Sequence, residues 1–199
     1  MTQESIQELI RKQREYFYTN ATLDVNFRIN SLKKIQTAIQ THQEQINAAL
    51  KADLGKSSFE SYMCESGLVL NEITYMLKHI RSLAKEKTVP TPLAQFHSRS
   101  YMKPSPYGVV LIMSPWNYPF LLTFDPLVEA LAAGNTVVLK PSAYSPATSR
   151  IICEIVRECF PEQYVAVVTG GREENACLLQ EHFDYIFFTG SQSVGKEVM

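Results

Sequence analysis

Hydrophobic side chains in the first 88 residues recur every three or four positions, with polar side chains between them. Steps of three, four and seven residues place side chains on one face of an α-helix. We therefore predict a layer of packed helices for residues 1–88, with a helix end at Gly55. The three apolar stripes contain Ile6, Leu9, Ile10 and Phe17; Leu32, Ile35, Ile39, Ile46 and Leu50; and Val69, Ile73, Met76, Ile80 and Leu83.

The pattern changes in residues 89–106, which carry two prolines near each end. Proline interrupts helices, so this segment is predicted to be a linker with a strand or hairpin arm. An exposed edge strand of this kind often pairs with another chain. The side chains expected to share one face of an extended strand are Phe96, Ser98, Ser100 and Met102.

From residue 107 to residue 199, short apolar runs alternate with segments of helical spacing. This alternation predicts an α/β fold with a parallel, doubly wound, Rossmann-like sheet, preceded by the helical layer and the strand arm. Gly134 predicts the end of one helix, and Asp125-Pro126 within that helix suggests a kink or a restart. The predicted strands are 109–113, 136–139, 165–168 and 185–188, and the predicted helices are 120–133, 146–159 and 172–180.

All four predicted strands end in polar, glycine-rich or proline-rich sequence. Ligands of parallel α/β sheets bind beyond the carboxyl ends of the strands, so these four tips are expected to converge on one binding edge. The tips are S-P-W-N-Y-P (114–119), K-P-S (140–142), T-G-G (169–171) and T-G-S-Q-S-V-G-K (189–196).

The last tip has two competing interpretations. G-x-x-x-x-G-K (190–196) matches a phosphate-binding P-loop, but that motif requires Ser or Thr next, where this chain has Glu197. An NTPase is therefore disfavoured. The alternative is a helix N-terminus that receives a dinucleotide pyrophosphate. Since G-x-G-x-x-G is absent, a dehydrogenase of the common Rossmann type is also disfavoured.

Composition excludes several classes of protein. The chain has 19 basic and 20 acidic residues, so no basic excess favours nucleic acid, and its apolar runs are too short for a membrane segment. The N-terminus lacks the apolar run of a secretory signal. Four histidines show no metal-ligand spacing, and four cysteines form no C-x-x-C pair, which favours reduced thiols in a cytoplasmic protein.

Three motifs in order carry a specific resemblance: P-Y-G-V-V-L-I-M-S-P-W-N-Y-P (106–119), G-N-T-V-V-L-K-P-S (134–142) and F-F-T-G-S-Q-S-V-G-K (187–196). Together they resemble the aldehyde dehydrogenase superfamily, most closely its class 3, fatty-aldehyde-type branch, over nearly the whole chain. The resemblance implies NAD- or NADP-dependent oxidation of an aldehyde to a carboxylic acid by the full-length enzyme. It also implies a homodimer.

The resemblance implies a role for each matching position. Asn117 would donate its side-chain amide to the oxyanion formed from the aldehyde oxygen. Many relatives carry at the position of Ala143 a glutamate that binds ribose, so its loss here is expected to let NADP bind at least as well as in those relatives. The residues implied in coenzyme binding are Ser114, Pro115 and Trp116 beside the nicotinamide, Lys140 and Ser142 at the ribose, Gly170 as a space-making glycine, and Gly190, Ser191, Val194 and Gly195 around the pyrophosphate and adenine.

The resemblance also shows what this chain lacks. The family mechanism uses a cysteine thiolate and a glutamate from an E-L-G-G-type segment. None of the four cysteines matches the nucleophile's motif, and no E-L-G-G segment is found here. We therefore expect residues 1–199 to be an N-terminal portion that exposes apolar surface and is inactive alone. Two alternatives stay open: a non-catalytic dinucleotide-binding module, and an interaction protein that uses the strand at 96–102.

Overall fold

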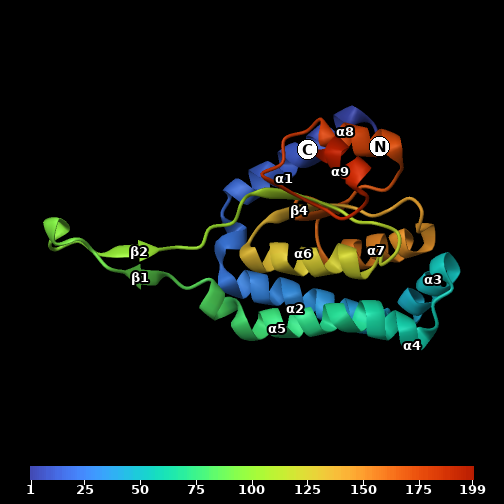
Figure 1. Ribbon diagram of the computed structural model, residues 1–199, viewed down its shortest axis with the longest axis horizontal. Coiled ribbons are helices and arrows are strands. Elements are labelled where there is room, and N and C mark those ends of the chain that lie inside the picture. The colour runs from blue at the N-terminus through green and yellow to red at the C-terminus, as the bar shows by residue number, and fades with distance from the viewer.

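A parallel four-stranded sheet forms from the four apolar runs that the sequence predicted as strands. The computed structural model describes all 199 residues. The strand order is β5-β4-β3-β6, and all neighbouring strands are parallel, which confirms the predicted α/β fold (Figure 1). Their bounds are β3 Val109–Met113, β4 Thr136–Lys140, β5 Val165–Val167 and β6 Tyr185–Phe188.

Helices cover both faces of this sheet, because side chains of buried strands alternate between the two faces. Val110 and Ile112 pack into the larger core with α6 (Leu121–Ala133) and α7 (Pro146–Cys159). Leu111 and Met113 pack on the other face with α1 (Gln3–Tyr18) and α8 (Arg172–Leu179). Figure 1 shows α1 and α8 above β4, and α6 and α7 below it.

A further helical layer packs below α6 and α7. It consists of α2 (Val25–Thr41), α3 (Gln43–Leu54) and α5 (Gly67–Leu83), whose apolar stripes join the larger core. The predicted helical layer is confirmed for the second and third stripes, but the first stripe lies on α1, which packs on the opposite face of the sheet. The second stripe is divided between α2 and α3 at His42, although its five hydrophobic side chains are all buried. Gly55 ends α3 in the left-handed conformation, as predicted.

A π-helical turn interrupts one continuous helical segment. α4 (Ser58–Ser61) passes into the π-helical turn Tyr62–Ser66 and then into α5. The turn requires Gly67, because a Cβ there would lie 2.6 Å from the carbonyl oxygen of Tyr62. With glycine at this position, the Gly67 N–H donates to the Tyr62 carbonyl. Single π turns of this kind are frequent at functional sites.

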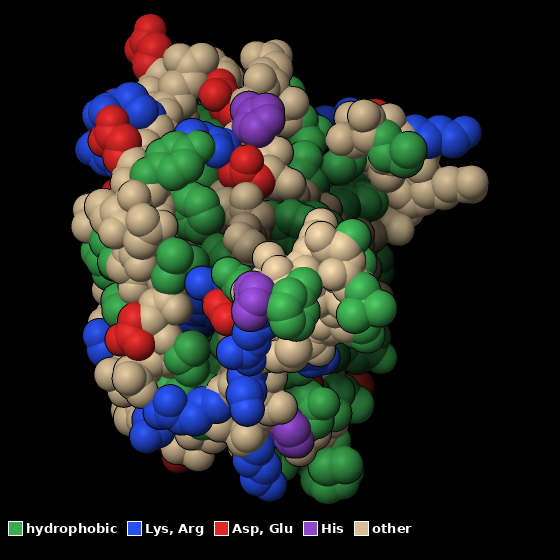
Figure 2. Space-filling model, turned by 90° about the vertical axis from the view of Figure 1, so that its left-hand side faces the viewer, with side chains coloured by type: hydrophobic (Ala, Val, Ile, Leu, Met, Phe, Trp, Pro, Cys, Tyr) green, Lys and Arg blue, Asp and Glu red, His purple; other side chains and the backbone are tan.

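The strands β1 (Lys87–Val89) and β2 (Ser100–Met102) pair antiparallel and form an arm that projects from the body (Figure 1). The predicted extended run from Phe96 to Met102 is wrong for residues 96–98. The chain reverses direction there through the 3₁₀ turn Leu93–Gln95 and a left-handed His97 with φ of 76°. Seen from the side on which the arm projects, hydrophobic and charged side chains are interspersed (Figure 2).

Helix α6 continues through Pro126 without a restart and ends at Gly134, whose φ of 99° is left-handed, as a helix-ending glycine requires. The buried Arg28 caps this end: its Nη1 donates to the carbonyl of Ala132 at 3.3 Å, and its Nε and Nη2 donate to carbonyls of the 3₁₀ turn Ala21–Leu23. The last helix is α9 (Gln192–Val198). Crossing a bilayer needs a longer and more apolar helix than any in this structure.

Candidate binding site at the strand ends

The carboxyl ends of the strands meet along one edge of the sheet, because all four strands run in the same direction. Met113 pairs with Lys140 on one side and with Phe188 on the other. Hydrogen bonds continue just past the strands: the Ser114 N–H donates to the Lys140 carbonyl at 3.2 Å, and the Thr189 N–H donates to the Met113 carbonyl at 3.2 Å. The segments after β3, β4 and β6 therefore lie side by side at this edge.

The segment between β3 and α6 is anchored at its start by two buried hydroxyls. Thr123 Oγ1 donates to the Pro119 carbonyl at 2.6 Å, and Ser114 Oγ lies 2.6 Å from the same Thr123 oxygen. Since Thr123 uses its single proton on Pro119, the Ser114 hydroxyl is the donor in the second contact. The Ser114 side chain is thus committed within the protein, and only its backbone can face a ligand.

The middle of this segment is exposed. Trp116 is 55% exposed, Pro115 is half-buried, and the side chain of Asn117 is exposed and has no hydrogen-bond partner in the chain. The Asn117 carbonyl accepts a hydrogen bond of 3.1 Å from Lys56 Nζ. The side-chain amide of Asn117 is therefore available to donate, while Lys56 holds the backbone that carries it.

A buried ion pair lies under this segment and was not predicted from the sequence. Lys56 Nζ donates to Glu65 Oε1 at 2.5 Å, and Glu65 is fully buried. Glu65 Oε2 accepts from the backbone N–H groups of Phe120 at 2.8 Å and Leu121 at 3.0 Å, at the start of α6. A carboxylate at a helix N-terminus satisfies donors that have no partner within the helix.

Lys140 is the most buried charged group at the strand edge, with 4% of its surface exposed. Its Nζ donates to the carbonyls of Gly170 at 2.7 Å and Pro141 at 3.0 Å. Burial lowers the pKa of Lys140, and the carboxylate of Glu174 partly opposes that shift. An ammonium group has three N–H donors, so one remains for a ligand after these two bonds.

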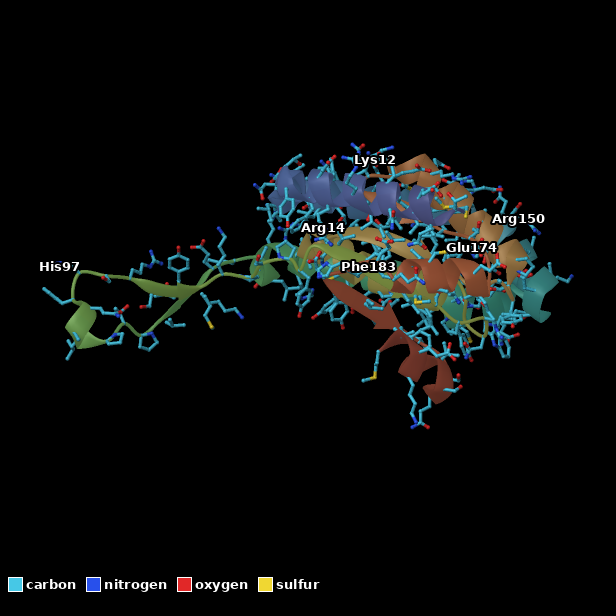
Figure 3. The ribbon with its side chains drawn as sticks, turned by 90° about the horizontal axis from the view of Figure 1, so that it is seen from above. Lys12, Arg14, His97, Arg150, Glu174 and Phe183 are labelled. Carbon is cyan, nitrogen blue, oxygen red and sulfur yellow. The ribbon has the colours of Figure 1, made fainter.

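A hollow of about 470 Å³ opens beside Lys140, between α7 and the Gly170 turn. Ser142 and Ala143 line it, as do Arg150 and Arg157 from α7. The two arginines stand seven residues apart and so share one face of that helix. Figure 3 shows Arg150 and Glu174 toward the end of the molecule opposite His97, which lies at the arm tip. The full lining is Pro141, Ser142, Ala143, Pro146, Ser149, Arg150, Cys153, Glu154, Arg157, Thr169 and Gly170.

Hydrogen bonds hold the segments that surround this hollow. Ser149 Oγ donates to the Ser142 carbonyl at 2.9 Å. From α3, Asp53 caps the start of α7 by accepting from the N–H groups of Ala147 at 3.1 Å and Thr148 at 2.7 Å. Gly170 has a φ of 134°, and a Cβ there would lie 2.2 Å from the Glu174 carboxylate. Only glycine therefore fits this turn.

The segment after β6 carries the last group of predicted residues. Ser191 caps α9, because its Oγ accepts from the Val194 N–H at 3.4 Å. Gly190 packs against Phe188, since a Cβ at Gly190 would lie 2.4 Å from its ring. Val194 is exposed and Gly195 is half-buried. The tip lies next to residues 114–117, because β6 is the neighbour of β3.

The structure therefore brings the predicted residues of three tips to one edge, with Gly170 joined to them through Lys140. Sequence reasoning missed Arg150 and Arg157, although their spacing of seven on a helix was a usable signal. It also missed Lys56 and Glu65, for which the sequence holds no local signal. No three His, Cys, Asp or Glu side chains are grouped so that they could hold a metal ion.

Comparison with known proteins identifies the family that shares this sequence and architecture. A sequence profile described as the aldehyde dehydrogenase family matches residues 1–199. The 4,4'-diaponeurosporen-aldehyde dehydrogenase of Staphylococcus aureus is 44% identical over 193 residues, which are 97% of this chain and 42% of that protein. Aldehyde dehydrogenase family 3 member B1 of Homo sapiens is 42% identical over 192 residues, covering 96% of this chain and 41% of that protein.

The solved structures agree with the sequence comparison. The substrate-bound state of Staphylococcus aureus AldH has a TM-score of 0.95 at 44% identity, and the match covers 97% of this chain and 42% of that chain. This chain thus spans about two fifths of the length of these relatives, from 41% to 42%.

Proposed function

Because this chain belongs to the aldehyde dehydrogenase family, we propose that it supplies the coenzyme site and the oxyanion donor of an enzyme that oxidises an aldehyde to a carboxylic acid with NAD or NADP. The observation that carries this proposal is the strand edge itself. It places the segment that carries the unpartnered amide of Asn117 beside the tip after β4, through the bond from the Ser114 N–H to the Lys140 carbonyl, and the β4 tip forms one wall of the hollow. A dinucleotide that binds in the hollow and extends to Asn117 can bring its nicotinamide ring to an aldehyde.

The residues present fit a dinucleotide. The hollow accepts an adenosine, Ser142 offers a half-buried hydroxyl, and the third N–H of Lys140 is free for a ribose hydroxyl. The turn at Gly190–Gly195 lets a pyrophosphate approach the backbone, with Ser191 as a donor and Val194 beside the adenine. When bound, the coenzyme accepts the hydride that the aldehyde loses. Pro115 and Trp116 would then line the nicotinamide side.

Asn117 is proposed as the donor to the aldehyde oxygen. Negative charge develops on that oxygen as a nucleophile attacks the carbonyl carbon, and a fixed N–H aimed at it stabilises the charge. The exposed, unpartnered amide of Asn117 can do this without first breaking a bond within the protein.

None of the four cysteines matches the motif that carries the family's nucleophile, and the two buried ones are also chemically unsuited to that role. Burial raises the pKa of Cys153, and it raises the pKa of Cys159 to about 11, so both are thiols rather than thiolates near neutral pH. We therefore propose that residues 1–199 bind coenzyme but do not oxidise aldehydes by themselves. All four cysteines are free, which supports a reducing, cytoplasmic location.

Coenzyme titration tests the site directly. The fluorescence of Trp116, the only tryptophan, should be quenched in a saturable way by NAD and by NADP but not by Mg-ATP. Ala143 itself supplies no carboxylate to repel a 2′-phosphate, and Arg150 and Arg157 outnumber the one carboxylate that lines the hollow, that of Glu154. NADP should therefore bind at least as well as NAD.

Two variants sharpen this titration. Ala143→Glu should weaken NADP binding relative to NAD by about tenfold, or ~1.4 kcal/mol, because it restores the repulsion. Arg150→Gln should also lower the affinity for NADP more than that for NAD. A strong preference of the unaltered chain for NAD would contradict the Ala143 argument, and no response to either dinucleotide would contradict the coenzyme site.

Catalysis is tested in a joined enzyme, in which residues 1–199 are followed by the remaining C-terminal length of the Staphylococcus aureus relative. We expect the joined enzyme to form reduced coenzyme only when an aldehyde is present, and residues 1–199 alone to form none. The absorbance of the reduced coenzyme measures the reaction. Joined enzyme that folds and binds coenzyme but never turns over an aldehyde would contradict the proposed activity.

The arm is proposed as a contact between two copies of the chain, giving a homodimer. Its tip carries hydrophobic side chains in water, with Leu93 91% exposed and Phe96 76% exposed. Its edges also leave backbone groups open for pairing. Light scattering of the purified joined enzyme should give the mass of a dimer, and Leu93→Ser with Phe96→Ser should lower it to that of a monomer. A monomer before substitution would contradict the proposal.

A further inference from the structure

We propose that Lys56 and Glu65 are positioning residues for catalysis, which hold the backbone of Asn117 so that its amide meets the aldehyde oxygen. This inference rests on the oxyanion role proposed for Asn117. Lys56 comes from the loop between α3 and α4, and Glu65 comes from the π-helical turn; they lie 61 and 55 residues away in sequence from the backbone groups that they bind.

Glu65 fixes the end of the segment that carries Asn117. Its Oε2 accepts from two successive backbone N–H groups, those of Phe120 and Leu121, at 2.8 and 3.0 Å. Its Oε1 accepts from Lys56 at 2.5 Å. Since Glu65 is fully buried, water cannot replace these contacts, and the carboxylate has one arrangement that satisfies them all.

Lys56 fixes the middle of the segment. Its Nζ donates to the Asn117 carbonyl at 3.1 Å and lies 4.2 Å from the centre of the Tyr118 ring, a cation–π contact. Among residues 115–117, the bond from Lys56 is the only hydrogen bond made within the chain. The start of the segment is held separately by Ser114 and Thr123. Loss of Lys56 therefore removes the only hydrogen bond to the part that bears Asn117, whereas the hydrogen bonds at both ends of the segment are made by other side chains.

The position of an oxyanion donor determines how much it contributes. A displacement of about 1 Å at a reacting group costs about 10²-fold in rate, because the interaction must be aligned in the transition state. The buried ion pair holds the backbone of the exposed residue Asn117. Without it, the Asn117 side chain would move together with its backbone. Lys56 and Glu65 do not touch the aldehyde themselves; they act through Asn117.

The first test uses residues 1–199 and needs neither coenzyme nor activity. Lys56→Met keeps the length of the side chain and removes the donor. We expect acrylamide to quench Trp116 more strongly and the fluorescence anisotropy of Trp116 to fall, because the segment loses the one hydrogen bond that holds its middle. Lys56→Arg should restore most of the original behaviour, because a guanidinium can again donate to the Asn117 carbonyl.

The matched control is Arg28→Met, which removes another buried cation that donates to backbone carbonyls. Arg28 caps the opposite end of α6, about 18 Å away for a 13-residue helix. It should lower stability without changing the acrylamide quenching or the fluorescence anisotropy of Trp116. Equal changes in both variants would overturn the inference, since general loosening would then explain them.

The second test measures kcat in the joined enzyme. Lys56→Met should lower kcat about tenfold or more while the dissociation constant for coenzyme changes less than twofold. Unchanged kcat, in a background where Asn117→Ala does lower it, overturns the positioning role and leaves the proposed function standing. If Asn117→Ala has no effect on kcat, the oxyanion role of Asn117 fails, and with it the catalytic meaning of the pair.

Discussion

Turnover by the joined enzyme should fall by about 10²–10³-fold when Asn117 is replaced by alanine, as is typical for the loss of one oxyanion donor. Alanine removes the side-chain N–H and leaves the backbone contact with Lys56 intact. The substitution lies at an exposed position, so the fold should be unaffected. Reduced coenzyme formed per enzyme and second, at saturating aldehyde and coenzyme, measures the effect.

Asn71→Ala is the control for this substitution, because Asn71 is an exposed asparagine on α5. It should leave kcat unchanged, and both variants should bind coenzyme as the unaltered enzyme does. A loss in coenzyme affinity that accounts for the whole effect of Asn117→Ala would place Asn117 in coenzyme binding and contradict the oxyanion role.

Replacing Glu65 with leucine should lower the free energy of unfolding of residues 1–199 by about 3–5 kcal/mol, the usual cost of removing one partner of a buried ion pair. Leucine leaves the ammonium of Lys56 buried without its counter-charge. It also leaves the N–H groups of Phe120 and Leu121 without an acceptor. Urea denaturation followed by circular dichroism gives the difference in stability.

The double variant Glu65→Leu with Lys56→Met separates these contributions. It removes the unpaired charge, so it should be more stable than Glu65→Leu alone. A deficit should remain, because the two N–H groups at the start of α6 are still unsatisfied, at about 1–3 kcal/mol each. If the double variant is as unstable as the single one, the ion pair contributes nothing and the acceptor role of Glu65 explains the whole effect.

The sequence was sufficient for elements whose signal is local. The strands at Val109–Met113 and Tyr185–Phe188 have the predicted bounds, and so does the helix Pro146–Cys159, in which proline occupies the first position and an apolar stripe follows. Small differences occur at strand ends: β4 includes Lys140, and β5 ends at Val167. A charged residue at a strand end has no local pattern that separates it from the following turn.

Features that depend on distant contacts could not be predicted. The break at His42 and the turn at residues 96–98 lie within patterns that are equally compatible with continued helix or strand. The Lys56–Glu65 pair is significant only because α6 begins beside it, 55 residues along the chain. For the candidate site, the strand tips could be named from the sequence, whereas their supports from α3, the π-helical turn and α7 required the fold.

The π-helical turn at Tyr62–Ser66 also acts as a phase shift between two halves of one helical segment. An α-helix rotates about 100° per residue. One additional residue in a turn therefore changes the direction in which all the side chains after it point, relative to those before it. Here Glu65 faces the start of α6, while Val69, Ile73 and Ile80 keep their places in the core. Deleting one residue from the turn would give a more regular helix and rotate one of these two sets away from its partners. The turn therefore has the character of a one-residue insertion that lets a core helix serve a second neighbour without repacking the core.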